Sequence, residues 1–454
     1  MERNYDVVIV GGGPGGLAAA KGAREAGADS VLVLEREDKV GGILNQCLHD
    51  GFGLVHYRAA LTGPEYARRA RLEAQEAGAA LLTGAMVTGL TPDRTLTAVT
   101  RRGLLTCRAG AVVLATGCRE RTRGAIAIPG TRPAGIYTAG AAQNLMNTKN
   151  LMVGRQVVIL GSGDIGLIMA RRLTLEGATV LCVVEMNAVP GGLERNVSQC
   201  LYDFGIPLHL RHTVTSIFGR KRLEGVELSR LDDCGQPIPG TQRRVDCDTL
   251  LLSVGLIPEN EVGAQGGVRL DPITNGALTD ACLQTNVPGV FSCGNSRRVM
   301  DLADFVTRQG QAAGANAARF LRGLALEPMP PETSTAMAKG LPQPGVTTCV
   351  LCPKGCRVTL LPGGEAKGNG CPKGEEYARQ EAVAPKRVLT TTLKDRRGRL
   401  VPVKTAAGVP KEKLLWCMER LRPLQLPETA RAPGDVAAKD PFGLGIDLLV
   451  SGEV

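Results

Sequence analysis

Residues 7–20 read VVIVGGGPGGLAAA: an apolar run, a glycine-rich turn and an alanine-rich stretch in direct succession. The apolar run predicts a buried strand, and the alanine-rich stretch predicts a helix packed closely on it. Gly11, Gly13 and Gly16 fit the pattern G-x-G-x-x-G. Such glycines permit a tight turn and let backbone N–H groups approach a pyrophosphate at the helix N-terminus. The stretch therefore predicts a dinucleotide-binding βα unit in an α/β domain.

The same unit is present twice in the chain. After the first turn, an apolar strand at 31–34 ends at Glu35, whose carboxylate is suited to accept both hydroxyls of an adenine ribose. A second strand at 157–160 leads into Gly161, Gly163 and Gly166, and a further strand ends at Glu185. The offset from first glycine to acid is 24 residues in both copies. Two complete fingerprints with one internal offset predict two dinucleotide sites.

Each unit closes on a strand that ends in a small residue and a glycine, which lets the backbone pass close to a bound cofactor. Residues 111–114 lead into Thr116 and Gly117, and residues 249–252 lead to Gly255. A third strand of this kind ends at Gly294 and Asn295. This third stretch lies between the second unit and an expected helix at about 309–321.

This order of motifs resembles the two-dinucleotide-binding-domain flavoproteins, such as thioredoxin reductase and glutathione reductase, from residue 4 to about residue 325. The resemblance implies an α/β fold with two Rossmann-like domains, FAD in the first and NAD(H) in the second. It assigns FAD to Gly11, Gly13, Gly16, Glu35, Gly42, Thr116, Gly117, Gly294 and Asn295, and NAD(H) to Gly161, Gly163, Gly166, Glu185 and Gly255. The family usually has Asp where this chain has Asn295, which brings no charge.

Glu185 favours NAD over NADP, because a 2′-phosphate beside a carboxylate is repelled. The dithiol of the disulfide reductases is missing: residues 41–53 contain only Cys47, and no cysteines are closely paired in the nicotinamide half. Cys47 is either a catalytic single thiol or, as we prefer, a packed one. His49 and His56 are not assigned a role, so the catalytic acid or base is unknown. Electrons must leave the flavin by a route other than a dithiol.

Composition limits the function classes. No apolar run is long enough to cross a membrane and no secretory signal is visible, so we expect a cytoplasmic protein without a transmembrane segment. From residue 346 onward, 18 Lys and Arg stand against 12 Asp and Glu. Aromatic residues make up 3% of the chain, which argues against nucleic-acid binding. The basic excess favours a solvated face or a docking surface for an acidic partner.

Four of the 14 cysteines lie close together near the C-terminus, with the spacing C-x2-C-x3-C-x14-C. Three closely spaced thiolates can surround one edge of a cluster and a distant fourth can close the set, so we expect a [4Fe–4S] cluster. Structural zinc and a redox disulfide stay open as alternatives. The candidate ligands are Cys349, Cys352, Cys356 and Cys371. The pattern is similar to the N-terminal iron–sulfur segment of molybdopterin oxidoreductases.

The segments at 374–378, 385–392 and 401–405 resemble a four-cysteine domain of uncharacterised function that accompanies bacterial glycerol-3-phosphate dehydrogenases. The flavoprotein half, at 41–49 and 61–67, resembles the NAD/FAD-dependent dehydrogenase of the same systems, with relatives among opine, proline and hydrogen-cyanide-forming dehydrogenases. This implies a hetero-oligomer with a second flavoprotein dehydrogenase that oxidises glycerol 3-phosphate or a related substrate. The expected domains are FAD-binding (1–120 and 259–325), NAD-binding (121–258), a proline-rich linker (326–346) and an iron–sulfur domain (347–454).

We therefore expect an FAD-dependent NAD(H) oxidoreductase subunit that relays electrons between nicotinamide, flavin and the cluster. Two other functions stay open. One is a stand-alone NADH-dependent reductase of a small acceptor with a structural zinc tail. The other is a non-catalytic electron-transfer or scaffold subunit.

Overall fold

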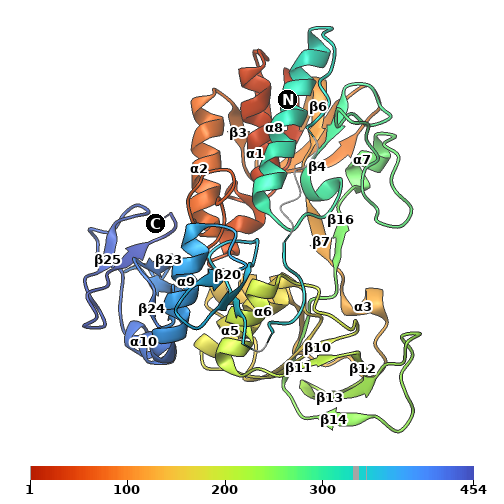
Figure 1. Ribbon diagram of the computed structural model, residues 1–454. Coiled ribbons are helices and arrows are strands. Elements are labelled where there is room, and N and C mark those ends of the chain that lie inside the picture. Colours follow the sequence, from red (N-terminus) through yellow and green to blue (C-terminus); the bar gives the residue numbers. More distant parts are fainter. Residues whose placement is uncertain (1, 331–336, 344, 454) are drawn as a thin grey trace. The chain divides into compact units, whose positions relative to one another are not determined.

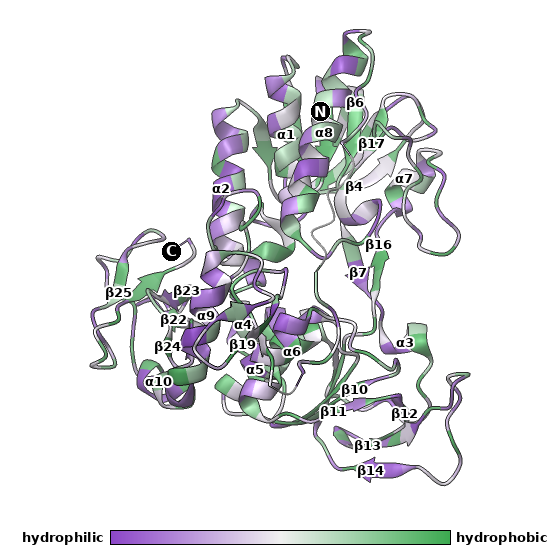
Figure 2. Cartoon of the chain, viewed as in Figure 1, coloured by the Kyte–Doolittle hydropathy of each residue, from purple (hydrophilic) through white to green (hydrophobic). Residues whose placement is uncertain are grey.

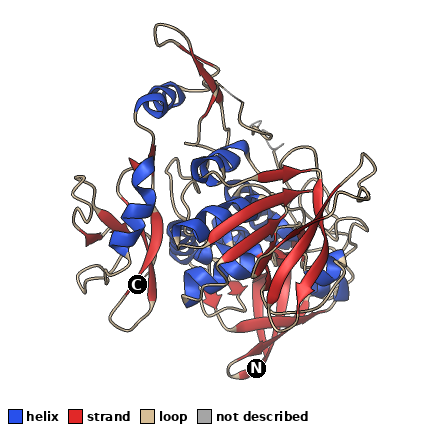
Figure 3. Cartoon of the chain, turned by 90° about the horizontal axis from the view of Figure 1, so that it is seen from below, coloured by secondary structure: helices blue, strands red, loops and turns tan. Residues whose placement is uncertain are grey.

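The computed structural model describes residues 2–330, 337–343 and 345–453. The predicted linker falls partly on 331–336 and 344, which lie outside the described residues. The chain forms two compact units: unit 1 comprises Met1–Arg119 and Leu256–Thr333, and unit 2 comprises Glu120–Gly255 and Ser334–Val454. Both units contain helices and strands. Figure 3 shows these two kinds of element in the chain, and the expected α/β class is confirmed.

Unit 1 is built on a seven-stranded sheet. Four of its neighbouring strands, in the order β3, β2, β1 and β6, are parallel, and the late strand β17 pairs in parallel with β6. Antiparallel β5 and β4 extend the sheet beyond β6. The bounds are β1 (Glu2–Val10), β2 (Val31–Leu34), β3 (Ala80–Leu82), β4 (Ala85–Leu90), β5 (Thr95–Thr100), β6 (Gly103–Leu114) and β17 (Val290–Ser292). The short strands β7 (Cys118–Glu120) and β16 (Leu256–Pro258) pair with each other.

Three helices of unit 1 run side by side in Figure 1: α1 (Pro14–Glu25), α2 (Gly63–Glu76) and α8 (Ala303–Leu321). Helices α1 and α8 touch along small residues. A Cβ added to Gly310 would lie 2.1 Å from the carbonyl oxygen of Gly15, and one added to Gly314 would lie 1.9 Å from that of Ala19. Helix α2 is largely hydrophilic in colour in Figure 2 and buries its alanines, such as Ala70 and Ala74. Shorter helices are η1 (Gly42–Gln46), α7 (Glu261–Gln265) and η3 (Gly294–Ser296).

The first part of unit 2 has a parallel five-stranded sheet in the order β11-β10-β9-β15-β8. These strands are β8 (Ile136–Thr138), β9 (Gln156–Leu160), β10 (Thr179–Glu185), β11 (Leu208–Leu210) and β15 (Thr249–Leu252). Its helices are α3 (Arg123–Ile126), α4 (Ala139–Lys149), α5 (Asp164–Leu175), α6 (Glu194–Cys200) and η2 (Tyr202–Phe204). An antiparallel sheet of β12 (His212–Gly219), β13 (Leu223–Arg230) and β14 (Arg243–Val245) supplies further core residues, among them Val226 and Leu228.

The rest of unit 2, residues 347–453, is called the C-terminal module. Its first part is a small sheet of β18 (Thr347–Thr348), β19 (Arg357–Leu360) and β20 (Ala366–Lys367), followed by α9 (Pro372–Val383). Its second part is a four-stranded sheet of β22 (Thr390–Lys394), β23 (Leu400–Thr405), β26 (Leu448–Val450) and β25 (Val436–Ala438). The remaining elements are β21 (Lys386–Arg387), β24 (Val409–Pro410), η4 (Lys411–Lys413) and α10 (Leu414–Leu421).

The C-terminal module shares its core and its buried charges with the rest of unit 2. Leu175, at the end of α5, packs in the same apolar cluster as Leu389 and Val403. The buried Arg387 side chain lies 2.6 Å from the carboxylates of both Asp203 and Glu381. Such paired charges fix the relative positions of the segments that carry them, because either charge alone is costly to bury.

No helix in the described ranges is long and apolar enough to span a membrane.

Candidate functional site

The first glycine turn joins β1 to α1 and has the geometry of a phosphate cradle. Gly11 has φ +105°, and a Cβ at Gly16 would lie 1.8 Å from the Gly11 carbonyl oxygen, so both positions require glycine. A Cβ at Gly13, in contrast, would meet no protein atom within 4 Å. Gly13 is also the N-cap of α1, without a side-chain cap. The open side of the turn therefore suits a diphosphate, which the helix N-terminus would attract.

Glu35 lies at the end of β2 beside this turn and is 5% exposed. One of its carboxylate oxygens accepts a hydrogen bond of 2.8 Å from the backbone N–H of Gly12, and the other accepts one of 2.8 Å from that of Glu37. These bonds fix the carboxylate while each oxygen keeps a lone pair, which is what binding of a ribose diol requires. Gly42 approaches the same turn, since a Cβ there would lie 3.1 Å from the Cα of Gly13.

The other predicted FAD residues of unit 1 lie at the ends of β6 and β17. The Thr116 hydroxyl donates to the Glu259 carbonyl at 2.5 Å, and a Cβ at Gly117 would meet nothing within 4 Å. The Gly294 N–H donates to the Gln309 side-chain oxygen at 3.0 Å. Asn295 accepts from the Met300 N–H at 3.0 Å and directs its amide nitrogen to the Cys118 sulfur at 3.5 Å. Asn295 thus holds its own loop, a role that the sequence does not indicate.

The second glycine turn, between β9 and α5, repeats the construction. Gly161 has φ +93°, and a Cβ there would lie 2.1 Å from the Ser253 carbonyl oxygen. A Cβ at Gly166 would lie 2.7 Å from the Ser253 Cβ, and one at Gly163 would lie 3.0 Å from the Ser253 hydroxyl oxygen. Gly255, with φ +103°, follows on the neighbouring strand end. The turn therefore needs its glycines for close packing against the end of β15.

Glu185 occupies the place in this turn that Glu35 has in the first. It is 5% exposed, and one carboxylate oxygen accepts from the Ser162 N–H at 3.0 Å and from the Ser162 hydroxyl at 2.5 Å. The other accepts from the backbone and side-chain N–H groups of Asn187 at 2.9 and 2.8 Å. These four hydrogen bonds hold the carboxylate in one orientation at the end of β10.

Sequence reasoning missed Asp164, the first residue of α5. Its Oδ1 accepts from the Leu193 N–H and from the Asn196 side-chain amide, both at 2.8 Å. Asp164 thus ties the nucleotide turn to the segment that begins α6. The only sequence signal is an acid in the first turn of a helix, which many helices have for electrostatic reasons alone.

The four C-terminal cysteines gather in one part of unit 2. The Cys349 N–H donates to the Cys356 carbonyl at 2.8 Å, and Cys371 directly precedes α9. Burial raises the pKa of the Cys349 thiol to about 11, and Cys352, Cys356 and Cys371 each add to the rise. Within the part of the chain that the structure describes, no three His, Cys, Asp or Glu side chains converge at the distances of a metal site. Four neighbouring thiols nevertheless form a donor set suited to iron–sulfur or zinc.

The remaining cysteines of the described ranges are free thiols. No disulfide joins any two cysteines of the described ranges. Cys47 is buried, donates to the Ile43 carbonyl at 3.3 Å, and has its pKa raised to about 12 by burial. It is therefore protonated at neutral pH and lacks the thiolate that disulfide exchange needs.

Comparisons with known proteins agree with this construction. Residues 5–310 match the family model "Pyridine nucleotide-disulphide oxidoreductase", and residues 372–451 match "Protein of unknown function (DUF1667)". One subunit of the opine oxidase of Agrobacterium tumefaciens is 26% identical over 76% of each chain. Thioredoxin reductase of Listeria monocytogenes is 26% identical over 71% of this chain and 96% of its own length.

Two solved structures share the fold. Thioredoxin reductase of Lactococcus lactis has a TM-score of 0.57 and 21% identity, covering 70% of this chain and all of its own. Thioredoxin reductase of T. acidophilum has a TM-score of 0.57 and 22% identity, covering 71% of this chain and all of its own. With the match over residues 5–310 and the two nucleotide turns, the chain belongs to the pyridine nucleotide-disulphide oxidoreductase family and is a flavin-dependent oxidoreductase of nicotinamide nucleotides.

Proposed function

We propose that this protein is an NADH-linked subunit of a larger dehydrogenase, in which the four-cysteine site carries electrons to or from the flavin. The observation that carries the proposal is the distribution of thiols. Four gather in the C-terminal module, whereas the one cysteine in residues 41–53, Cys47, is buried and protonated at neutral pH. A disulfide reductase instead needs an accessible thiol with a low pKa at its exchange site.

The residues of the chain bind and orient, while the bound groups supply the redox chemistry. The two glycine turns and the carboxylates of Glu35 and Glu185 would hold the diphosphates and riboses of FAD and NAD(H). When bound, flavin and nicotinamide exchange a hydride, and a cysteine-ligated cluster carries single electrons. Cys349, Cys352, Cys356 and Cys371 would hold that cluster.

The proposed partner is a second flavoprotein dehydrogenase that oxidises glycerol 3-phosphate or a related small substrate. Two kinds of relative are named as parts of larger enzymes: the glutamate synthase small chain of Mycobacterium tuberculosis, which is 26% identical over 73% of this chain, and the opine oxidase subunit. Exposed lysines flank the cysteines at Lys354, Lys367 and Lys373. They would attract an acidic partner, and salt would weaken that attraction.

The metal tests the proposal directly. Anaerobically purified protein is expected to contain about four iron and four sulfide per chain, as for a [4Fe–4S] cluster. Cys352→Ser should lose the iron and its broad visible absorbance while FAD stays bound, because FAD is assigned to unit 1 and Cys352 lies in unit 2. Elemental analysis and visible spectra provide the measurements.

Cys234→Ser is the matched control, because Cys234 is exposed and lies outside the cluster of four. It should keep both iron and FAD. Stoichiometric zinc without iron after anaerobic preparation would contradict the electron-carrying role and favour a structural metal.

A further inference from the structure

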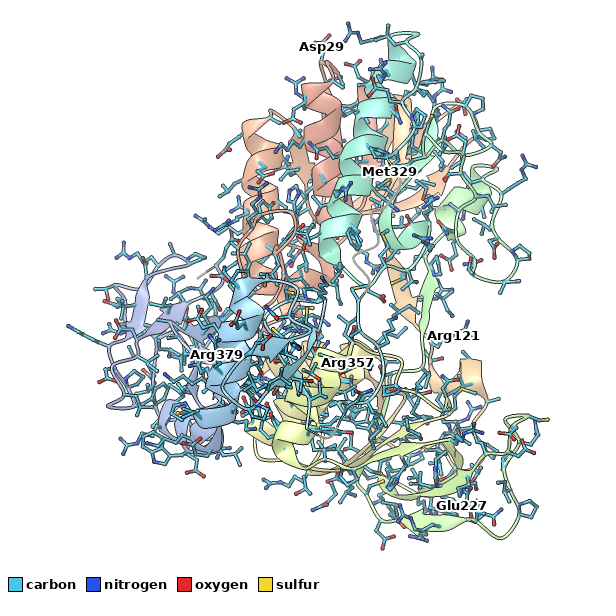
Figure 4. The ribbon with its side chains drawn as sticks, viewed as in Figure 1. Asp29, Arg121, Glu227, Met329, Arg357 and Arg379 are labelled. Atoms are coloured by element: carbon cyan, nitrogen blue, oxygen red, sulfur yellow. The ribbon has the colours of Figure 1, made fainter. Side chains whose placement is uncertain are left out.

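Glu194 is a buried carboxylate that the proposed function does not use. It is the first residue of α6 and has no solvent exposure. One carboxylate oxygen accepts from the Thr348 hydroxyl at 2.8 Å, and the Arg357 guanidinium donates to both oxygens at 2.5 to 3.1 Å. In Figure 4 the labelled Arg357 lies at the blue hairpin beside the yellow helix α6. Such a bidentate, charge-assisted contact fixes both distance and orientation.

Both partners of Glu194 adjoin the proposed metal ligands. Thr348 precedes Cys349, and Arg357 follows Cys356, so Glu194 holds the two ends of the loop that carries three of the four cysteines. The loop also rests on the start of α6, since a Cβ at Gly355 would lie 3.8 Å from the Arg195 backbone nitrogen. The position of the cysteine loop is therefore set by α6.

The start of α6 is in turn held by the second glycine turn (residues 161–166), the proposed NAD(H) site, which is called the nicotinamide turn below. The Gly191 N–H donates to the Ser162 hydroxyl at 2.9 Å, and the Gly192 N–H donates to the Ser162 carbonyl at 2.9 Å. The Asp164 carboxylate adds its two bonds to the same segment, from the Leu193 N–H and the Asn196 amide. Residues 191–196 thus lie between the glycine turn and the cysteine loop and are hydrogen-bonded to both.

We propose that Glu194 is a positioning residue that couples the nicotinamide turn to the four-cysteine site, so that nucleotide bound at the turn restrains the cysteine loop. The inference rests on the proposed function only in treating the four cysteines as a site. A nucleotide that restrains Ser162 and Asp164 also restrains residues 191–196. The hydrogen bonds of Glu194 extend this restraint to Thr348 and Arg357. Coupling of this kind is reciprocal: a metal in the cysteine site changes nucleotide affinity by the same factor.

The test measures thiol reactivity in the full-length, FAD-loaded protein after chelation and reduction. Iodoacetamide labelling of each cysteine is followed by mass spectrometry with and without saturating NAD⁺, the oxidised form, which leaves the flavin oxidised. NAD⁺ is expected to slow labelling of Cys352 and Cys371 about fivefold, at the lower end of typical couplings. Cys234, exposed and away from this loop, serves as the internal reference and should not change.

Glu194→Gln keeps the size of the side chain but loses its charge, and should reduce the protection by NAD⁺ to less than about twofold. Glu381→Gln is the matched control. It weakens another carboxylate–arginine pair of unit 2, that of the half-buried Glu381 with the buried Arg387, and should keep the full effect. If Glu194→Gln does not fold, Thr348→Val removes one of the two partners and carries the same test.

A second readout is NAD⁺ affinity with and without Zn²⁺ as the only added metal. The dissociation constant of NAD⁺ should change with Zn²⁺ by the same factor as that of Zn²⁺ changes with NAD⁺ in the parent protein, and both should change less in Glu194→Gln. Absence of any nucleotide effect in the parent, or an undiminished effect in Glu194→Gln, overturns the inference. Neither result depends on iron or on electron transfer, so this inference and the proposed function can fail separately.

Discussion

Two buried carboxylates, Glu35 and Glu185, take equivalent positions in the two nucleotide turns. Each accepts a backbone N–H from the second residue of its turn and another from two residues further along its own strand end. Glu185 accepts two side-chain donors in addition, from Ser162 and Asn187. The second acid is therefore the more tightly held, and in the proposed NAD(H) site its charge would repel a phosphate on the adenine ribose.

Glu185→Gln tests the preference for NADH. The parent should reduce its flavin with NADH much faster than with NADPH, because the carboxylate repels a 2′-phosphate. Loss of a charged hydrogen-bond acceptor costs about 1.5 to 3 kcal/mol, so the rate ratio of NADH to NADPH should fall by about 10- to 160-fold. Stopped-flow flavin reduction at matched nucleotide concentrations provides the measurement. Equal rates in the parent protein would show that Glu185 does not contact the ribose.

Alanine substitutions at Gly13 and Gly16 distinguish an effect on cofactor binding from an effect on protein packing. Gly13→Ala should fold normally, because its Cβ meets no protein atom, yet lose most of the bound FAD, because the methyl occupies the diphosphate space. Gly16→Ala should lower the melting temperature of the whole unit, because its Cβ would lie 1.8 Å from a carbonyl oxygen. FAD content and thermal unfolding distinguish the two. A Gly13→Ala protein with full FAD would place the diphosphate elsewhere.

At the scale of elements, the sequence predicts the strand–turn–helix units well and the contacts between them poorly. The turns at Gly11 and Gly161 are local, so glycine spacing and strand pattern suffice to locate them. The pairing of Arg387 with Asp203, separated by 184 residues, carries no local signal, and neither does that of Glu194 with Arg357. In the sequence both acids are ordinary residues of short helices. Only the tertiary fold shows that they are buried and paired.

The pair of Arg387 and Glu381 predicts a pH dependence for unit 2. Burial raises the pKa of the Glu381 carboxyl, but the hydrogen bonds and charge of Arg387 outweigh it and keep the pKa below its ordinary value of 4.5. A lowered folded-state pKa stabilises the protein fully above the unfolded-state pKa, and the benefit is lost as pH falls through the folded one. The melting temperature of unit 2 should therefore fall as the pH drops below about 4.5, and it should fall less in Glu381→Gln.

Arg387→Met should destabilise unit 2 by about 3 kcal/mol, because it removes the buried guanidinium and leaves Asp203 and Glu381 only the more exposed Lys411 as a cation. Arg396→Ala breaks an exposed pair with Glu428 and should cost less than about 1 kcal/mol. The change in unfolding free energy of each variant is measured by hydrogen exchange of the α5 and β22 amides in increasing urea. Similar losses of unfolding free energy in the two variants would show that the Arg387 pairs contribute no more to stability than an exposed pair.

At the scale of the whole molecule, the C-terminal module belongs to the compact unit that contains the nicotinamide turn. Arg172 of α5 donates to the Thr391 hydroxyl at 3.1 Å and to the Asn147 amide oxygen at 3.0 Å, so one buried guanidinium joins α4, α5 and β22. Leu175 completes the connection through the apolar core. A ligand that binds only the folded unit should therefore stabilise both parts.

Native-state hydrogen exchange tests whether the C-terminal module and the first part of unit 2 unfold together. Amides of β22 and β23 should exchange with the same free energy as those of β9 and β10, and NAD⁺ should raise the protection of all four strands together. The strands β1 and β6 of unit 1 provide the comparison. Separate, lower protection of β22 and β23, insensitive to NAD⁺, would make the module an independently unfolding domain.

The close contact of α1 with α8 has a consequence for synthesis of the chain. Unit 1 closes only when residues 303–321 pack on residues 14–25, and the glycines at this contact leave no space for a larger residue. At about 5 to 20 residues per second, α8 leaves the ribosome roughly 15 to 60 s after α1. During that interval the nicotinamide half has already emerged while the first half still exposes the apolar face that α8 covers. The nascent chain is therefore expected to need chaperone protection first at its N-terminal end, and to take up its flavin last.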